Sequence, residues 1–238
     1  MSDEHLLIAS VVVLLAAFVQ GASGMGFALI TAPVLTLLAP ALLPVCVLIL
    51  MLPLNAYVAW RERHALDRRG ATWISAGRLV GTFGGLAVLM VLSAQALSIF
   101  VGVSTIAAAA ITWVIPAFTP GLTAFIVAGL ITGVTETATG IGGPPLALTL
   151  QHRPPAEMRA TMALCFLVGE VISLIVLAAM DKVQMLHLSA ALQLLPALVI
   201  GGVASRFVHH RIPGRTMRIF VQSFAVISGL VLLIKALW

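Results

Sequence analysis

Three ionisable side chains lie inside long apolar stretches of this sequence: Arg78, Glu136 and Glu170. A charge inside a membrane segment is costly unless it is paired or hydrated, so each one marks a candidate functional position. Glu136 directly precedes a glycine-rich interruption and could carry a coupled proton. Alternatively, it hydrogen-bonds the backbone there and holds the interruption open. Arg78 could contact a substrate charge or extend its guanidinium group to the nearby membrane surface.

Asn55 and Glu170 occupy comparable places in the apolar segments that follow the two interruptions. The simplest role for both is an interhelical hydrogen bond, which buried polar groups of membrane helices commonly form. Their positions also make them candidates for coupling or gating, together with Glu136 and Arg78.

Two apolar segments, residues 6–38 and 121–151, exceed the roughly 20 residues that one membrane-spanning helix needs. Glycine-rich runs interrupt both segments, at residues 21–26 and 137–145. Glycine weakens a helix and proline removes a backbone donor, so we expect each segment to form two half-helices joined by a break. The second half-helices should begin near Phe27 and near Pro145.

The start of a half-helix offers unpaired N–H groups and the positive end of a helix dipole, which together attract an anion. Glycine lets a ligand approach this backbone closely, and hydroxyl groups add donors. We therefore expect residues of both breaks to bind a small anionic substrate: Gln20, Ser23, Gly24, Gly26, Thr139, Gly140, Gly142, Gly143 and Pro144. The alternative is that Gly and Pro only kink long helices and let neighbouring helices pack closely.

The composition indicates that lipid is the solvent of this chain. Of 238 residues, 61% are hydrophobic and 9% are charged, whereas soluble domains carry about a quarter charged residues. The 13 basic residues cluster between apolar segments, as in cytoplasmic loops, so nucleic-acid binding is not expected. The histidines lie at segment ends or in loops, and both cysteines lie within apolar runs. The sequence therefore predicts no metal site and no cofactor.

The remaining apolar segments each have the length of one transmembrane helix: 41–60, 72–91, 95–115, 160–180, 187–208 and 217–237. If the broken segments also crossed the membrane, the arginines would divide almost evenly between the two sides. If each broken segment is instead a re-entrant hairpin, the arginines near residues 61–69, 153–159 and 206–218 share one face. The positive-inside rule favours this second arrangement, with both termini outside.

The two halves of the sequence resemble each other. The run 23–26 matches the run 139–142, which places Gln20 on Glu136. We expect one all-α integral membrane domain made of two inverted repeats, residues 1–116 and 117–238. Each repeat would be a glycine-broken hairpin followed by three transmembrane helices. The hairpin tips would enter from opposite faces and approach each other near the midplane.

The two glycine breaks, the run Gly140–Pro145 and the duplicated half resemble the TauE/SafE family of membrane transporters over most of the chain. The resemblance implies secondary transport of small anions such as sulfite, sulfoacetate, related organosulfonates or sulfur oxyanions, and no enzymatic activity. It also implies a bacterial inner membrane, where termini that lie outside would be periplasmic. It extends by position to the glycine motifs alone: Gly24, Gly26, Gly140, Gly142, Gly143 and Pro144. The roles of the other candidate residues rest on the physical argument.

Other functions stay open from the sequence. A passive anion channel would use the same features, although an inverted repeat favours alternating access. Residues 21–24 match the Gly-x-Ser-Gly pattern of intramembrane serine proteases, but no histidine lies near the membrane centre to accept the Ser23 proton. A cation or metal transporter using Glu136 and Glu170 would lack Asp or His partners within the spans. The chain could act as a monomer or as a homodimer.

Overall fold

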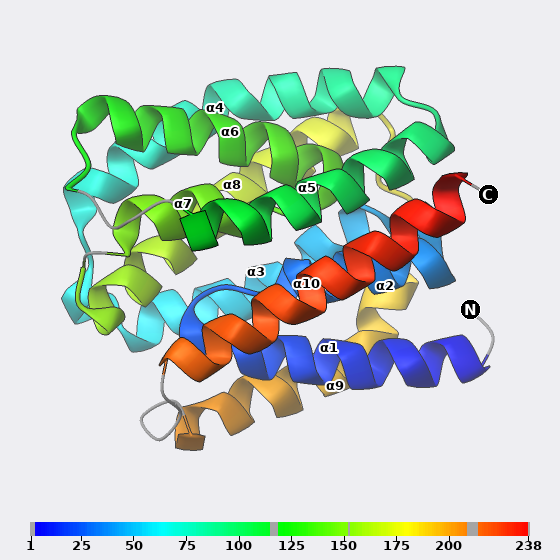
Figure 1. The fold of residues 1–238 in the computed structure, drawn as a ribbon, viewed down its shortest axis with the longest axis horizontal. Coiled ribbons are helices and arrows are strands. Elements are labelled where there is room, and N and C mark those ends of the chain that lie inside the picture. Colours follow the sequence, from blue (N-terminus) through cyan, green and yellow to red (C-terminus); the bar gives the residue numbers. More distant parts are fainter. Residues whose placement is uncertain (1–2, 115–118, 152, 209–213, 238) are drawn as a thin grey trace.

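The computed structural model describes residues 3–114, 119–151, 153–208 and 214–237. Every regular element in these ranges is helical (Figure 1). The elements are α1 (Asp3–Ser23), α2 (Phe27–Leu38), η1 (Pro40–Leu42), α3 (Val45–Arg61), η2 (Arg63–Ala65), α4 (Arg68–Val91), α5 (Ala94–Val114), α6 (Leu122–Thr139), α7 (Gly143–Leu150), α8 (Pro155–Ala179), α9 (Met185–Val208) and α10 (Gly214–Leu237).

The outer surface of this bundle is apolar and its interior holds the polar groups. Seven described helices are long and apolar enough to cross a membrane: α1, α4, α5, α6, α8, α9 and α10. Large hydrophobic side chains such as Val91, Met185 and Phe207 are exposed on the outside, as expected where lipid is the solvent. The all-α, multi-pass membrane class predicted from the sequence is confirmed.

The chain reverses direction at the first glycine break. Gly21, near the end of α1, lies against Ser205, near the end of α9. Ala41, which follows α2, accepts a hydrogen bond of 2.9 Å from the ring of His187, near the start of α9. Because the two contacts fall at opposite ends of α9, α2 runs back along the bundle after α1. The chain therefore folds back on itself at the first break.

The second break reverses the chain in the same way. Phe125, near the start of α6, contacts Gly70 near the start of α4, whereas Thr137 lies beside Gly85 further along α4. After α7 the chain returns to the start of α4, where Arg153 forms a 3.1 Å ion pair with Asp67. Asp67 is the N-cap residue of α4 and accepts the Gly70 N–H.

Each broken segment forms two helices, one on either side of its glycine break, and the first helix is the longer one in both segments. The helix α1 has 21 residues and α2 has 12, and α6 has 18 residues and α7 has 8. Gly21 stays helical because its missing side chain lets α1 approach α9, and an added Cβ would lie 2.1 Å from Ser205 Oγ. Thr139 stays helical and donates to the Thr135 carbonyl at 2.7 Å. The second short helix begins at Gly143, two residues earlier than expected.

The arginine-bearing junctions lie together at one end of the bundle. In Figure 1 the α3–α4 and α7–α8 connections, the end of α9 and the start of α10 are on one side, and both chain termini are on the other. Residues 209–213, part of the third arginine-rich stretch, lie outside the described residues.

Helix packing follows a reciprocal pattern between the two halves of the chain. Helix α1 packs against α9, and α6 packs against α4, through glycines such as Gly201 and Gly81.

Candidate functional site

An ion pair between Arg78 of α4 and Glu136 of α6 lies at the centre of the bundle. Arg78 Nη2 donates to Glu136 Oε2, and both side chains are 0% exposed. The guanidinium group therefore does not extend to the membrane surface, which was one alternative from the sequence. Glu136 occupies the last turn of α6, where its backbone carbonyl accepts the Gly140 N–H. The pair thus attaches the second break directly to α4.

The guanidinium group fits against a glycine of α8. A Cβ at Gly169 would lie 2.0 Å from Arg78 Cζ, and the Phe166 ring centroid is 5.7 Å from the same atom. Any side chain at position 169 would therefore displace the arginine. The sequence reasoning missed Gly169 and Phe166, although a glycine directly before the intramembrane Glu170 is a signal that could have revealed the first of them.

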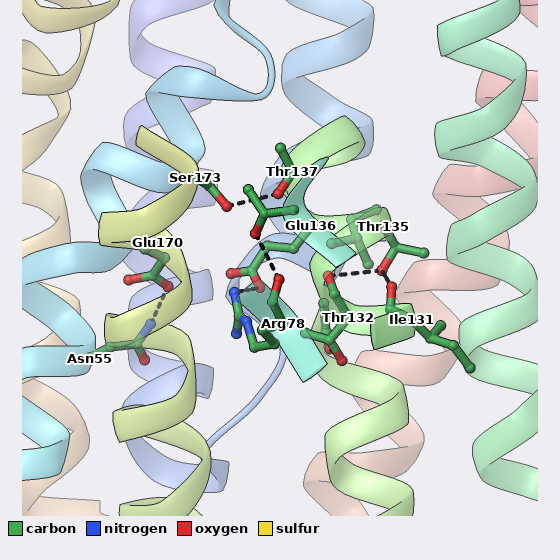
Figure 2. Close-up of polar contacts among 12 residues, drawn as sticks. Asn55, Arg78, Ile131, Thr132, Thr135, Glu136, Thr137, Glu170 and Ser173 are labelled. Atoms are coloured by element: carbon green, nitrogen blue, oxygen red, sulfur yellow. Dashed lines mark hydrogen bonds and ion pairs between the residues drawn. The ribbon is translucent and has the colours of Figure 1, made fainter. Parts of the chain in front are cut away.

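A chain of three hydrogen bonds joins the first break to Glu170. The Phe27 N–H donates to Gln20 Oε1 (3.1 Å), and Gln20 Nε2 donates to Asn55 Oδ1 (3.1 Å). Asn55 Nδ2 then donates to Glu170 Oε1 at 2.6 Å, and Figure 2 shows these last two side chains pointing toward each other. The Phe27 N–H, at the start of α2, is therefore capped by the Gln20 side chain.

The second break folds back onto the charged pair. Gly142 lies against Glu136, where an added Cβ would be 2.5 Å from Oε2, and its carbonyl accepts from Thr132 Oγ1 at 3.1 Å. The Thr139 hydroxyl accepts the Ile141 N–H at 3.1 Å. Gly140 adopts a positive φ of 81°, which ends α6. Pro144 stands in the first turn of α7, where its missing N–H is tolerated.

The first break is closely packed. Gly24 and Gly26 have positive φ angles of 84° and 117°, conformations that favour glycine. A Cβ at Gly24 would lie 2.7 Å from Arg159 Cγ, and one at Gly26 would lie 2.9 Å from Val19 Cγ1. The Ser23 hydroxyl donates to the backbone carbonyls of Val19 and Met25. No hydrogen bond to a histidine is found for Ser23, so the triad geometry of a serine protease is absent from the described residues.

The two breaks touch each other. A Cβ added to Gly143, the first residue of α7, would lie 3.8 Å from the Met25 Cβ. The first break therefore reaches the start of the short helix after the second break. The second break in turn lies beside the Arg78–Glu136 pair, through Gly142.

A network of charges that the sequence reasoning did not single out holds the first break at the arginine-rich end. Arg61 Nη2 donates to the Gly21 carbonyl at 2.9 Å and to Glu62 at 2.8 Å. Arg159 Nε donates to both Glu62 oxygens at 3.0 Å, and Gly24 packs directly on Arg159. Glu62 thus bridges two arginines that both contact the first break.

Several buried polar atoms at the centre have no hydrogen-bond partner among the described residues. They are Arg78 Nε and Nη1, Glu136 Oε1 and Glu170 Oε2. Unsatisfied buried polar groups are uncommon and often mark sites of ligand binding or movement. The described residues contain no group of three or more His, Cys, Asp or Glu side chains placed to hold a metal ion.

Broken helices around a buried charged centre, inside an apolar helical bundle, are typical of secondary transporters. A family model described as "Sulfite exporter TauE/SafE" matches residues 9–232. The chain therefore belongs to the TauE/SafE family, and it is a membrane transporter and not an enzyme. No curated protein and no solved structure matches it significantly.

Proposed function

We propose that this chain is a secondary transporter of small anions that works by alternating access, with sulfite, sulfoacetate or related organosulfonates and sulfur oxyanions as substrates. One observation carries the proposal: Arg78 is fully buried against Glu136 at the second break, and two of its nitrogens have no partner among the described residues. A guanidinium group presents N–H donors in a fork that matches the oxygens of a sulfonate or sulfite group.

In this proposal the anion binds Arg78 in competition with Glu136. Gly142 lies against Glu136 and Gly143 follows it, so their backbone N–H groups are available to help stabilise the negative charge of the bound anion. Glu136 then gives up the arginine and accepts a proton, so that the buried centre keeps the same net charge. Proton coupling follows from the cost of leaving an additional charge unpaired in a buried site.

Alternating access suits this geometry better than a passive channel. The side chains of Arg78, Glu136 and Glu170 are all 0% exposed, so an anion reaches them only if the surrounding helices move. The two breaks approach the centre from opposite ends of the bundle, which supports inverted repeats of residues 1–116 and 117–238. Movement of one break at a time would open the site to one side of the membrane.

The proposed membrane orientation places the arginine-rich end in the cytoplasm. The α3–α4 and α7–α8 connections, the end of α9 and the start of α10 share that end, and both ends of the described chain share the other (Figure 1). With two re-entrant hairpins and six full crossings, both termini would be periplasmic and the protein would reside in the inner membrane. The reciprocal packing of α1 on α9 and of α6 on α4 is what two inverted repeats would produce.

The function is tested by anion binding to the purified protein. Thermal unfolding is measured with sulfite, sulfate, thiosulfate, sulfoacetate, taurine and acetate. We expect one or more of the sulfur anions to raise the unfolding temperature of the wild type and to have no effect on Arg78→Gln. Uptake of that anion into proteoliposomes then tests transport. Equal stabilisation of the wild type and Arg78→Gln would exclude Arg78 as the anion-binding group.

A further inference from the structure

Two carboxyl groups and one guanidinium group are completely buried at the centre of the bundle. Glu136 and Glu170 are 0% exposed, whereas the other six carboxylate side chains are exposed or only half-buried where the structure describes them. We propose that Glu136 and Glu170 share a single negative charge opposite Arg78, and that Glu170 carries the proton while no anion is bound. Glu170 is then a second proton site of the transporter.

The argument begins with charge balance. If both carboxyl groups were ionised, the buried centre would hold two negative charges against one positive charge. An uncompensated charge in a buried site is strongly unfavourable, so one carboxyl group keeps a proton. The aspartic-protease pair is the general precedent for two nearby carboxyl groups that cannot both ionise.

The contacts assign that proton to Glu170. Glu136 bonds directly to the guanidinium group of Arg78 and is the natural counter-ion. Glu170 accepts one hydrogen bond, from Asn55, and its Oε2 has no partner among the described residues. An ionised carboxylate can accept about four hydrogen bonds, so a single acceptor contact suits the neutral acid better than the anion.

The surroundings of Glu170 supply one positive charge and one negative charge. Helix α3 presents Asn55, α4 presents Arg78 and α6 presents Glu136. The short helix α7 has no ionisable side chain. Besides Glu170, α8 carries the thiol of Cys165 and, in its first turns at the arginine-rich end, Glu157 and Arg159. The remaining neighbour is η2, whose Arg63 and His64 are exposed at the arginine-rich end. Arg78 packs on Gly169, the residue next to Glu170. The guanidinium group can therefore act as the counter-ion of either Glu136 or Glu170.

The consequence for transport rests on the proposed function. When a monoanion binds Arg78, the negative charge on Glu136 is replaced by that of the anion, and Glu136 takes up one proton. If Glu136 is replaced by glutamine, Glu170 becomes the counter-ion of Arg78 and takes up the proton instead. Each carboxyl group can therefore substitute for the other, and only loss of both removes proton uptake.

Infrared spectroscopy of the anion-free protein at neutral pH tests the shared proton. The C=O band of a protonated carboxylic acid should be present in the wild type and shift on exchange into D₂O. It should be absent from Glu170→Gln and from Glu136→Gln, because in the latter Glu170 ionises to balance Arg78. It should about double in Arg78→Gln, where both carboxyl groups become neutral. A wild-type spectrum without the band, or a band that survives Glu170→Gln, overturns the proposal.

Proton uptake on anion binding gives a second test, with methanesulfonate as a probe that stays a monoanion. A pH-sensitive dye should report about one proton per bound anion in the wild type and in each single variant, and none in Glu136→Gln/Glu170→Gln. Loss of uptake in Glu136→Gln alone would show that Glu170 cannot carry the proton. If methanesulfonate does not bind, the anion proposal is weakened, while the infrared result still decides the state of Glu170.

Discussion

Asn55 and Glu170 are hydrogen-bonded to each other at 2.6 Å, although they are 115 residues apart in the sequence. They hold comparable places in the two halves, on α3 and α8, which pack together. On α3, Asn55 accepts a hydrogen bond from Gln20. On α8, Glu170 directly follows Gly169, on which Arg78 packs. This contact therefore joins the two halves of the chain at the point where their polar groups meet.

We predict that Asn55→Asp makes stability depend on pH. The new carboxyl group would share a proton with Glu170 at low pH. As the pH rises, that proton is lost and two carboxylates repel each other in a buried place, so stability falls. The unfolding temperature should drop more steeply at alkaline pH than in the wild type, and adding Glu170→Gln should reduce this extra pH dependence, because a single buried carboxyl group then remains. Parallel curves for the single variant and the wild type would contradict the prediction.

A second prediction concerns the glycines of the second break. Gly142→Ala should strongly weaken anion binding, because its methyl group would lie 2.5 Å from Glu136 Oε2. Gly121→Ala is the control, because it lies outside the breaks and an added Cβ there meets nothing within 4 Å. Binding measured by thermal shift should persist in the control. Equal losses in both variants would mean that the space at Gly142 is unimportant.

A third prediction tests the space that Gly169 leaves for Arg78. Gly169→Ala should destabilise the protein by about 1–3 kcal/mol, as overpacking of a filled interior does, in spite of the better helix propensity of alanine. Gly121→Ala is the control, because an added Cβ there meets nothing within 4 Å, and we expect an effect within about 0.5 kcal/mol. Unfolding by heat or denaturant compares the two. A neutral Gly169→Ala would show that Arg78 can readily move elsewhere.

Topology is tested by labelling single cysteines, with the two native cysteines buried. His64→Cys in η2 and Ala156→Cys in α8 should both react with a membrane-impermeant thiol reagent from the cytoplasm. Ser93→Cys, between α4 and α5, should react from the periplasm only. Labelling of positions 64 and 156 from opposite sides would reject the two re-entrant hairpins and restore eight crossings.

The sequence was sufficient to locate both breaks and the buried charges, because glycine runs and intramembrane acids are visible without any structure. It could not reveal how those groups pair. Arg78 and Glu136 are 58 residues apart, and nothing in the local pattern distinguishes a buried arginine from one that reaches the surface. The capping of Phe27 by Gln20 was missed for a related reason, since a helix start was assumed to be open and no side chain was assigned to it.

The lengths of the hairpin arms were also beyond the sequence pattern. Glycine at position 21 was taken as part of the break, but tertiary packing against Ser205 keeps it helical. Conversely, the ring contact of His187 with Ala41 shows that a histidine at a span end can be buried and hydrogen-bonded. In both cases a partner far away in the sequence decides the local conformation.

The last prediction concerns the bridge that Glu62 makes between Arg61 and Arg159. Both arginines contact the first break, so Glu62 should hold that break closed toward the arginine-rich end. Replacing Glu62 by a neutral residue removes ion pairs that, when partly exposed, stabilise the closed break by about 1 kcal/mol. Their loss corresponds to about a fivefold rise in the fraction of molecules in which the first break is open. In a Ser23→Cys background, Glu62→Gln should therefore speed labelling from the cytoplasm by about that factor.

The matched control for this experiment is Glu157→Gln. Glu157 pairs with Arg153 at 3.0 Å at the same end of the bundle, and among the described residues no ion pair joins it to the arginines that contact the first break. Both variants change the net charge of the protein by the same amount. The control should nevertheless leave the labelling rate of the cysteine at position 23 unchanged, because Glu157 is not part of the Glu62 bridge. If the two variants accelerate labelling alike, the effect comes from general electrostatics. If neither does, the Glu62 bridge does not limit opening of the first break.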